Sequence, residues 1–449
     1  MRVPAHERYT LDNGVKLILI ARHDVPLIAF EAVVRGGASQ LARPQAGMAS
    51  LTAELLTRGA GERDAFEFAD AVEGAGGSFE ADAQTEAMLL HGQFLAKDQE
   101  LMMQLLADAL QRPHLEQQEF DTVRSRRIEF IRATKDGEPQ SLIGAYGRSM
   151  LFAQHPYGTS VGGSESTLAA LQRRQVTTFY QRQFGPQRLT LVFAGDFDPS
   201  ALAAAVNRSF GAWRATPAPL QSLTAPPAVR GRRVLLIDAP NSTQSYFWIA
   251  NVGVSRCYEA RAALDVTNTA FGGSFGSMLV QALRVKTGLT YSVGSSFRRG
   301  SVAGEFAISS FTQTASTAAA IDIALQALGT LKREGLGETA IASARSYILG
   351  QYPLSLETAA DWAGALAELD LFALPCSHID EYAPQLAAVD TALSRRVVDT
   401  AFPSADNLDI VVIGDAARLR AQVAAFGPVT EKPLQAPDFE AAVPQVAHA

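Results

Sequence analysis

The strongest constraint on the fold of this chain is an order of elements that occurs twice in its 449 residues. Leu189–Ala194 and Leu408–Ile413 are apolar runs of strand length, and each is followed directly by Gly-Asp. Each run closes a stretch that opens with a pair of strand-like segments and continues with a pair of helical segments. Repetition on this scale is typical of a duplicated domain rather than of a solenoid, whose repeats are only about 20–50 residues long.

The two halves of the chain carry matching elements in the same order. In the first half we predict strands at Val15–Ile20 and Leu27–Val34, helices at Gly47–Leu56 and Ala65–Glu73, a hairpin near Ser78–Phe94, helices at Gln99–Gln111, Leu115–Ala133 and Thr167–Phe184, and a strand at Leu189–Ala194. In the second half we predict strands at Val234–Ile237 and Tyr246–Val252, a helix at Phe275–Arg284, a strand at Glu305–Ser310, helices at Ala318–Lys332 and Gly337–Tyr352, and a strand at Leu408–Ile413. This order favours an α+β fold of two duplicated domains, each a mostly antiparallel sheet packed against helices.

A proline-rich segment lies between the halves. Residues 215–229 contain Pro217, Pro219, Pro226 and Pro227. Such a segment is extended and suits a connection between domains. We therefore expect an N-terminal domain over residues 1–214, a linker over residues 215–229 and a C-terminal domain over residues 230–449.

Charge and cysteine content exclude several classes of protein. The formal net charge is −7 and the sequence has no basic stripe, which argues against a nucleic-acid-binding protein. Cys257 and Cys376 are the only cysteines, so the chain can build neither a disulfide framework nor a cysteine zinc site.

The sequence contains no segment that predicts a membrane span. No apolar run approaches the roughly 20 residues needed to cross a bilayer. Met1–Thr10 is polar and lacks the apolar core of a signal peptide. Because the first predicted strand begins soon afterwards, an export signal could have been removed ahead of it. We expect a soluble protein of the periplasm or the cytoplasm, with the choice between them open.

The most informative local pattern lies at Phe271–Val293. One apolar stripe of an α-helix, at positions i, i+3, i+4, i+7 and i+8, consists of Phe275, Met278, Leu279, Ala282 and Leu283. Ser274 suits the N-cap of this helix, and Gly288 suits the left-handed residue that ends it. Leu289, Tyr291 and Val293 then alternate with polar residues, which is the period of a strand.

Arg284 and Tyr291 stand out within this pattern. At about 100° per residue, Arg284 points away from the centre of the apolar stripe, and Tyr291 opens the following strand. Taken alone, this pattern is equally that of a solvated cation at a helix end and a half-buried strand residue.

Two other patterns are interpreted as structural. Gly272–Ser277 reads GGSFGS but lacks the Gly-Lys-Ser/Thr ending of a phosphate-binding loop, so we interpret it as a flexible lead-in to the helix. His155, in the sequence His-Pro-Tyr-Gly, is interpreted as a turn residue rather than a metal ligand.

With both halves in view, the chain resembles the pitrilysin/insulinase family of zinc peptidases, above all its bacterial and mitochondrial processing-peptidase branch. The segments that carry the resemblance are LDNGVKLIL from Leu11, HPYGTSVGGSEST from His155, LTLVFAGDFD from Leu189 and LRVKTGLTYSV from Leu283. The resemblance covers nearly the whole chain and implies two duplicated α+β domains. Family members carry an arginine and a tyrosine at the spacing of Arg284 and Tyr291, and this pair helps to hold substrate across the cleft from the metal.

The zinc motif of the family is not preserved in this chain. Active members carry His-x-x-Glu-His on the first long helix, with two imidazoles at i and i+4 and a glutamate as base. Aligning the glycines that flank GMASLTAELLTRG places Ser50 and Glu54 at the histidine positions. Ala53 falls at the base, and Phe130 falls near the third ligand, which is a glutamate in the family.

These residue types cannot complete the nitrogen and oxygen set that zinc requires. None of the seven histidines has another histidine at i+4. We therefore expect no metal in this chain, and we interpret Ser50 and Glu54 as a solvated helix face or a surface that faces a partner.

The resemblance and the missing ligands together imply a non-catalytic, substrate-binding subunit of a heterodimeric zinc metallopeptidase. A homologous partner with an intact His-x-x-Glu-His motif would bring zinc and the general base, and this chain would supply Arg284 and Tyr291 to bind a peptide. One alternative is a purely structural scaffold, like the processing-peptidase relatives in respiratory cytochrome bc complexes, which would not need the Arg/Tyr pair. A second alternative is a peptidase that acts alone or as a homodimer through another metal site, and the absence of ligand geometry argues against it.

Overall fold

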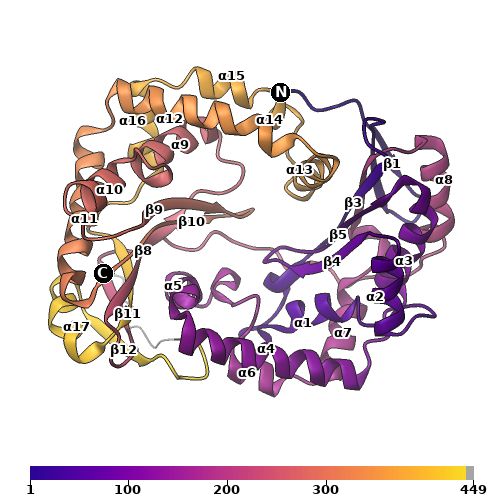
Figure 1. Cartoon of the computed structure of the whole chain (residues 1–449), viewed down its shortest axis with the longest axis horizontal. Coiled ribbons are helices and arrows are strands. Elements are labelled where there is room, and N and C mark those ends of the chain that lie inside the picture. The colour runs from indigo at the N-terminus through magenta and orange to yellow at the C-terminus, as the bar shows by residue number, and fades with distance from the viewer. Residues whose placement is uncertain (441–449) are drawn as a thin grey trace. The chain divides into compact units, whose positions relative to one another are not determined.

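The computed structural model describes residues 1–440, which form two compact units, each built around one six-stranded sheet (Figure 1). Unit 1 consists of residues 1–130, 159–222 and 353–380, and unit 2 of residues 131–158, 223–352 and 381–440. The two sheets with their helices confirm the α+β fold expected from the internal repeat.

The sheet of unit 1 has the strand order β1-β2-β6-β3-β5-β4. Its strands are β1 (Glu7–Thr10), β2 (Lys16–Ala21), β3 (Leu27–Arg35), β4 (Ser78–Ala83), β5 (Ala87–Leu95) and β6 (Leu189–Gly195). Only β2 and β6 are parallel neighbours, and the other pairs are antiparallel. The main helices on this part of the chain are α1 (Met48–Leu55), α2 (Ala65–Gly74), α3 (Gln99–Gln111), α4 (Gln117–Gly137), α6 (Glu165–Ala170), α7 (Arg173–Gln183) and α8 (Pro199–Phe210).

The sheet of unit 2 has the order β12-β7-β11-β8-β10-β9. Its strands are β7 (Arg232–Asp238), β8 (Gln244–Gly253), β9 (Val293–Arg299), β10 (Gly304–Gln313), β11 (Leu408–Gly414) and β12 (Val429–Pro433). Here β7 is parallel to both β11 and β12, and the remaining pairs are antiparallel. Its helices include α9 (Arg261–Asn268), α10 (Met278–Val280), α11 (Thr317–Glu334), α12 (Glu338–Gln351), α15 (Tyr382–Ala387), α16 (Thr391–Ala401) and α17 (Ala416–Val423).

The strand orders of the two sheets correspond position by position. The edge position that β1 holds in unit 1 is held in unit 2 by β12, which comes from the far end of its half of the sequence. The β1 strand pairs antiparallel with its neighbour, whereas β12 pairs parallel. The duplication therefore covers five of the six strands in each sheet. The sixth strand, β1 or β12, comes from a different end of its half of the sequence and pairs in a different direction.

Each unit also contains a helix from the other half of the sequence. Helix α13 (Ala359–Leu371) packs on β3 and β6 of unit 1, and helix α5 (Ile143–Phe152) packs on β8 and β11 of unit 2. The α13 helix is anchored by Asp370, which accepts hydrogen bonds from Lys16 Nζ at 2.9 Å and Thr190 Oγ1 at 2.8 Å. The compact units therefore do not coincide with contiguous halves of the sequence.

The burial of the central strands β6 and β11 explains why α13 and α5 pack on the two sheets. Every residue of β6 and of β11 is buried, so both faces of each strand need a covering layer. A continuous apolar run of this kind cannot face water on one side without exposing several large side chains.

Two further expectations can be compared with the structure. The prediction of a single helix over Thr167–Phe184 is wrong, because Leu171 and Gln172 are extended and separate α6 from α7. The proline-rich segment 215–229 contains no helix or strand and includes the boundary between the units, at Ser222–Leu223.

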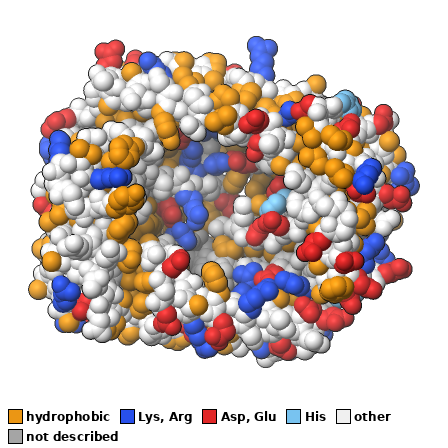
Figure 2. All heavy atoms as spheres, in the orientation of Figure 1, with side chains coloured by type: hydrophobic (Ala, Val, Ile, Leu, Met, Phe, Trp, Pro, Cys, Tyr) orange, Lys and Arg blue, Asp and Glu red, His pale blue; other side chains and the backbone are white. Residues whose placement is uncertain are grey.

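The surface agrees with the charge analysis. On the face shown in Figure 2, lysine and arginine side chains are interspersed with aspartate and glutamate, and no broad basic area is present. Within residues 1–440, every helix is too short or too polar to serve as a membrane span.

Candidate functional site

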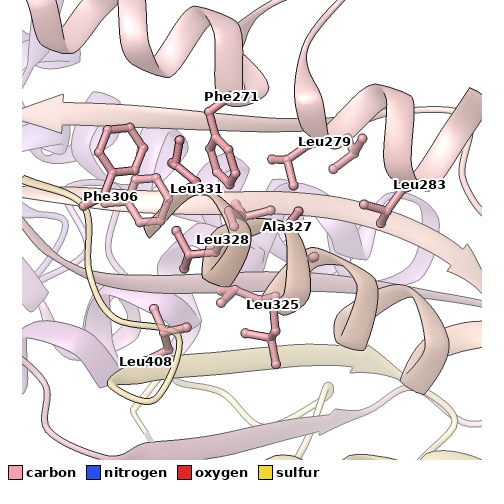
Figure 3. Close-up of a cluster of buried hydrophobic side chains, with 14 of the residues drawn as sticks. Phe271, Leu279, Leu283, Phe306, Leu325, Ala327, Leu328, Leu331 and Leu408 are labelled. Carbon is pink, nitrogen blue, oxygen red and sulfur yellow. The ribbon is translucent and has the colours of Figure 1, made fainter. Parts of the chain in front are cut away.

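The segment that carries Arg284 is held by the core of unit 2. Phe271, Leu279 and Leu283 are fully buried, and Figure 3 shows them in the core cluster that also contains Leu328 and Phe306. Fully burying side chains of this size stabilises the unit by about 1.5–3 kcal/mol each. These buried side chains therefore hold the backbone around Arg284 in place.

This segment is not the regular helix that the sequence predicts. Helix α10 begins only at Met278, after Ser277 at its N-cap, and it is followed by a wide π-helical turn over Gln281–Val285. The predicted cap is also wrong, because Ser274 Oγ instead donates a hydrogen bond to the carbonyl of Thr269 at 3.1 Å. Phe275, which was assigned to the apolar stripe, is 67% exposed.

The turn after Arg284 determines where Tyr291 lies. The Lys286 N–H donates to the Gln281 carbonyl at 3.0 Å, five residues back, and Gly288 has the left-handed φ of 64° that was expected. The loop is tied to β10 by Thr312 Oγ1, which donates to the Leu289 carbonyl at 2.6 Å. The next strand starts at Val293 rather than at Tyr291, so Tyr291 stands in the loop and is 73% exposed.

Arg284 contacts two exposed aromatic rings. Its guanidinium carbon is 4.8 Å from the ring centroid of Phe275 and 4.6 Å from that of Tyr291. Each such cation–π contact at an exposed site contributes about 0.5–1 kcal/mol. Within residues 1–440 the guanidinium makes no hydrogen bond and no ion pair, so its N–H donors remain available to a ligand.

The family's zinc-motif positions lie on α1, in unit 1. Ala53 is 1% exposed and packs into the unit, whereas Ser50 and Glu54, at i and i+4, lie on the less buried side of the helix. Glu54 does not lie on a solvated face, which was the first of the two interpretations drawn from the sequence, because its side chain is only 18% exposed.

Three arginines surround Glu54. Arg127 Nε donates to Glu54 Oε2 at 3.0 Å, and Arg127 Nη2 donates to the Ser50 carbonyl at 3.3 Å. Arg126 also pairs with Glu54, and the Arg58 guanidinium lies 3.6 Å from the Glu54 carboxylate. Burial, together with the charge of Arg126, lowers the pKa of Arg127.

These residues do not fit a zinc ion. The one carboxylate that could act as a ligand is already engaged by guanidinium groups, and a dication placed beside them would be repelled by their charge. Phe130, on α4 one turn beyond Arg126, is 71% exposed and offers no ligand atom. The sequence showed the loss of the histidines, but it gave no signal for the arginines, which lie more than 70 residues from Glu54 in the case of Arg126 and Arg127.

A separate polar cluster lies on β4 and β5 of unit 1. Glu80 and His91 are cross-strand partners, and their side chains approach to 3.5 Å, with Asp82 beside them. Glu31, on β3, is the other cross-strand partner of His91. Burial and the charge of Asp82 raise the pKa of Glu31 to about 7.

Comparisons with known proteins agree with this fold and with the missing metal site. The family model described as Insulinase (Peptidase family M16) matches residues 20–164, and the model described as Peptidase M16 inactive domain matches residues 170–348. An uncharacterized zinc protease of Mycobacterium leprae is 26% identical over 81% of this chain and 82% of its own length. The non-peptidase homolog YmxG of Helicobacter pylori is 24% identical over 77% of this chain and 79% of its own length.

Solved structures show the same fold. A peptidase M16 inactive domain from Pseudomonas fluorescens superposes with a TM-score of 0.84 at 21% identity, covering 91% of this chain and 98% of that one. A protease from Helicobacter pylori superposes with a TM-score of 0.82 at 17% identity, covering 91% and 99%. With matches to both family models and no zinc-ligand set at the motif positions, the chain belongs to the insulinase (M16) family of peptidases as a non-catalytic member.

Proposed function

We propose that this chain is the substrate-binding subunit of a heterodimeric zinc metallopeptidase. A homologous subunit with an intact His-x-x-Glu-His motif supplies zinc and the general base, and Arg284 and Tyr291 of this chain bind the peptide at that active site. The observation that carries the proposal is the partly exposed Arg284, whose guanidinium contacts the Tyr291 ring and makes no hydrogen bond or ion pair within residues 1–440.

The chemistry of the pair suits a peptide substrate. A guanidinium offers five N–H donors in a rigid plane, and a phenol offers one O–H, so both can donate to backbone carbonyl oxygens. When peptide hydrolysis places negative charge on the carbonyl oxygen, a preorganised donor is worth about 2.7–4 kcal/mol. The stack with Tyr291 provides that preorganisation, because it restricts a long side chain that would otherwise sample many rotamers.

The arginines around Glu54 support the non-catalytic part of the proposal. In this chain the α1 position is occupied by charge-paired side chains rather than by groups that can hold and activate a water molecule. Hydrolysis therefore has to be performed by the partner, which is where this proposal places the zinc.

A reconstituted peptide-cleavage assay tests the proposal. The chain alone is expected to be inactive, and the mixture with a His-x-x-Glu-His partner is expected to cleave a fluorogenic peptide. Arg284→Ala should lower kcat/KM of the mixture about 100-fold. Lys286→Ala, an exposed cation two residues further on, is the matched control and should leave it unchanged.

Two outcomes would contradict the proposal. Chelator-sensitive activity of the isolated chain would place a working metal site in it. Undiminished activity of the mixture with Arg284→Ala and with Tyr291→Ala, while the subunits still assemble, would favour the purely structural scaffold.

A further inference from the structure

Phe275 is exposed although its large apolar neighbours at i−4 and i+4 are buried. It is 67% exposed, whereas Phe271 and Leu279, four residues before and after it, are fully buried. An exposed phenylalanine lowers solubility and does not stabilise the core. Exposed apolar groups beside a cation are typical of binding surfaces.

We propose that Phe275 is a positioning residue that adds a second cation–π contact to Arg284, beside that of Tyr291, and thereby fixes Arg284 for peptide binding. Its action on the peptide rests on the proposed function, whereas its action on Arg284 is a property of the isolated chain. The Arg/Tyr spacing identified in the sequence accounts for the contact with Tyr291 but not for the contact with Phe275.

Both rings lie within cation–π distance of the Arg284 guanidinium. The Phe275 and Tyr291 centroids lie at nearly equal distances from the guanidinium carbon, 4.8 and 4.6 Å. The guanidinium makes no hydrogen bond or ion pair within residues 1–440, so its five N–H donors are available beside these ring contacts. The side chain is therefore held while its hydrogen-bonding groups stay open to a backbone carbonyl of the peptide.

The local backbone is what brings the two residues together. At about 100° per residue, the nine residues from Phe275 to Arg284 would span about two and a half turns of a regular helix, which places them on opposite sides. The turn over Ser274–Ser277 interrupts the helix, with the Ser277 N–H donating to the Ser274 carbonyl at 3.1 Å. This turn removes Phe275 from the apolar stripe. The Phe275 ring centroid then lies 4.8 Å from the Arg284 guanidinium carbon.

The rings also suit the ligand. Phe275 and Tyr291 both contact the cation and expose most of their surface, so a peptide whose carbonyl binds Arg284 can lay apolar side chains on them. Val285, which is 57% exposed, adds apolar surface in the same segment. The ligand that fits is an extended peptide with apolar residues next to the bound carbonyl.

The positioning role can be tested in the isolated chain by NMR. Ring currents from two stacked rings should shift the Arg284 Nε–H proton upfield, and Arg284→Lys assigns the signal by removing it. Phe275→Leu should move the signal downfield, whereas Phe275→Trp should keep it upfield. Phe66→Leu, at an exposed phenylalanine in unit 1, is the matched control. An unchanged Arg284 signal in Phe275→Leu would overturn the inference.

The effect on the peptide is tested in the reconstituted mixture. Phe275→Leu should lower kcat/KM about two- to fivefold, and Phe275→Trp should restore it. In the double variant Phe275→Leu/Arg284→Ala, the loss should equal that of Arg284→Ala alone, since the ring acts through the cation. Additive losses would show that Phe275 does not act through Arg284.

The outcomes separate this inference from the proposed function. If Arg284→Ala leaves activity unchanged, the proposed function fails, and the NMR result still decides the stack. If Arg284→Ala lowers activity and Phe275→Leu alters neither the Arg284 signal nor kcat/KM, only the role of Phe275 is overturned.

Discussion

Arg127 donates a hydrogen bond to Glu54 at 3.0 Å, and Glu54 is the residue that aligning the flanking glycines assigns to the second zinc-binding histidine of the family motif. The substitution is thus more than the loss of a ligand, because the carboxylate at this position is paired with fixed cations. The pairing ties α1 to α4 within unit 1, and it gives Ser50 and Glu54 a structural role in place of a catalytic one.

Restoring the three ligands alone should not restore zinc binding. The variant Ser50→His/Glu54→His/Phe130→Glu supplies the ligand types, but Arg126 and Arg127 remain beside them and repel a dication. Adding Arg126→Ala and Arg127→Ala should tighten zinc binding at least about tenfold, measured by isothermal titration calorimetry. The Arg126→Ala/Arg127→Ala variant without new ligands is the control, and equal affinities with and without the arginines would contradict the electrostatic explanation.

Removing the charge of Glu54 should destabilise the chain. Glu54→Gln keeps the shape of the side chain but leaves the guanidinium groups of Arg126, Arg127 and Arg58 without their shared anion. Because Arg127 is largely buried, the expected loss is about 1–3 kcal/mol in the free energy of unfolding, measured by urea denaturation. Glu73→Gln, at an exposed position on α2, should change it by less than about 0.5 kcal/mol.

Glu31 should make stability depend on pH in the neutral range. Burial and Asp82 raise its pKa from 4.5 to about 7, so between these pH values the folded chain holds a proton that the unfolded chain has released. Stability contributed by this group is therefore present below about pH 4.5 and is lost as the pH rises to 7. Glu31→Gln should stabilise the chain by about 2–3 kcal/mol more at pH 8 than at pH 4, measured by denaturation at both pH values. An equal effect at both would contradict the raised pKa, for which a carboxyl-carbon NMR titration is the direct check.

The exchanged helix α13 should be needed for the stability of unit 1. Leu366 is fully buried on this helix, which covers the face of β3 and β6. Leu366→Ala should cost about 2–5 kcal/mol because it leaves a cavity in the core. Leu354→Ala, at a position that is 61% exposed, is the matched substitution and should cost far less. Similar losses for both variants would mean that α13 is not part of the core.

The sequence predicted strands such as β2, β3, β6, β8 and β11 because each has a local signature, whereas β1 and β12 were not predicted and β9 was predicted only at its first residue, Val293. Leu189–Gly195 and Leu408–Gly414 are apolar apart from Thr190 and Asp409, and this composition favours a buried strand. The exchange of α5 and α13 could not be predicted, since a helix that packs on its own half has the same periodicity as one that packs on the other. The sequence analysis also missed the arginines around Glu54 and the contact between Phe275 and Arg284. The contacts of the arginines join residues that are distant in the sequence. The contact of Phe275 depends on the Ser274 hydroxyl, which donates a hydrogen bond to the Thr269 carbonyl instead of capping a helix.

Tyr291 has two separable functions in the proposed site, and two substitutions distinguish them. The ring stacks on Arg284, with its centroid 4.6 Å from the guanidinium carbon, while the exposed hydroxyl is a donor for the peptide. Tyr291→Phe keeps the ring, so the Arg284 Nε–H signal should stay upfield while kcat/KM of the reconstituted mixture falls about tenfold through loss of the donor. Tyr291→Leu removes both functions, so the signal should move downfield and kcat/KM should fall a further two- to fivefold, roughly the value of one cation–π contact. If Tyr291→Phe matched the wild-type chain in the cleavage assay, the hydroxyl would have no part in binding, and the tyrosine would act only by holding Arg284 in place.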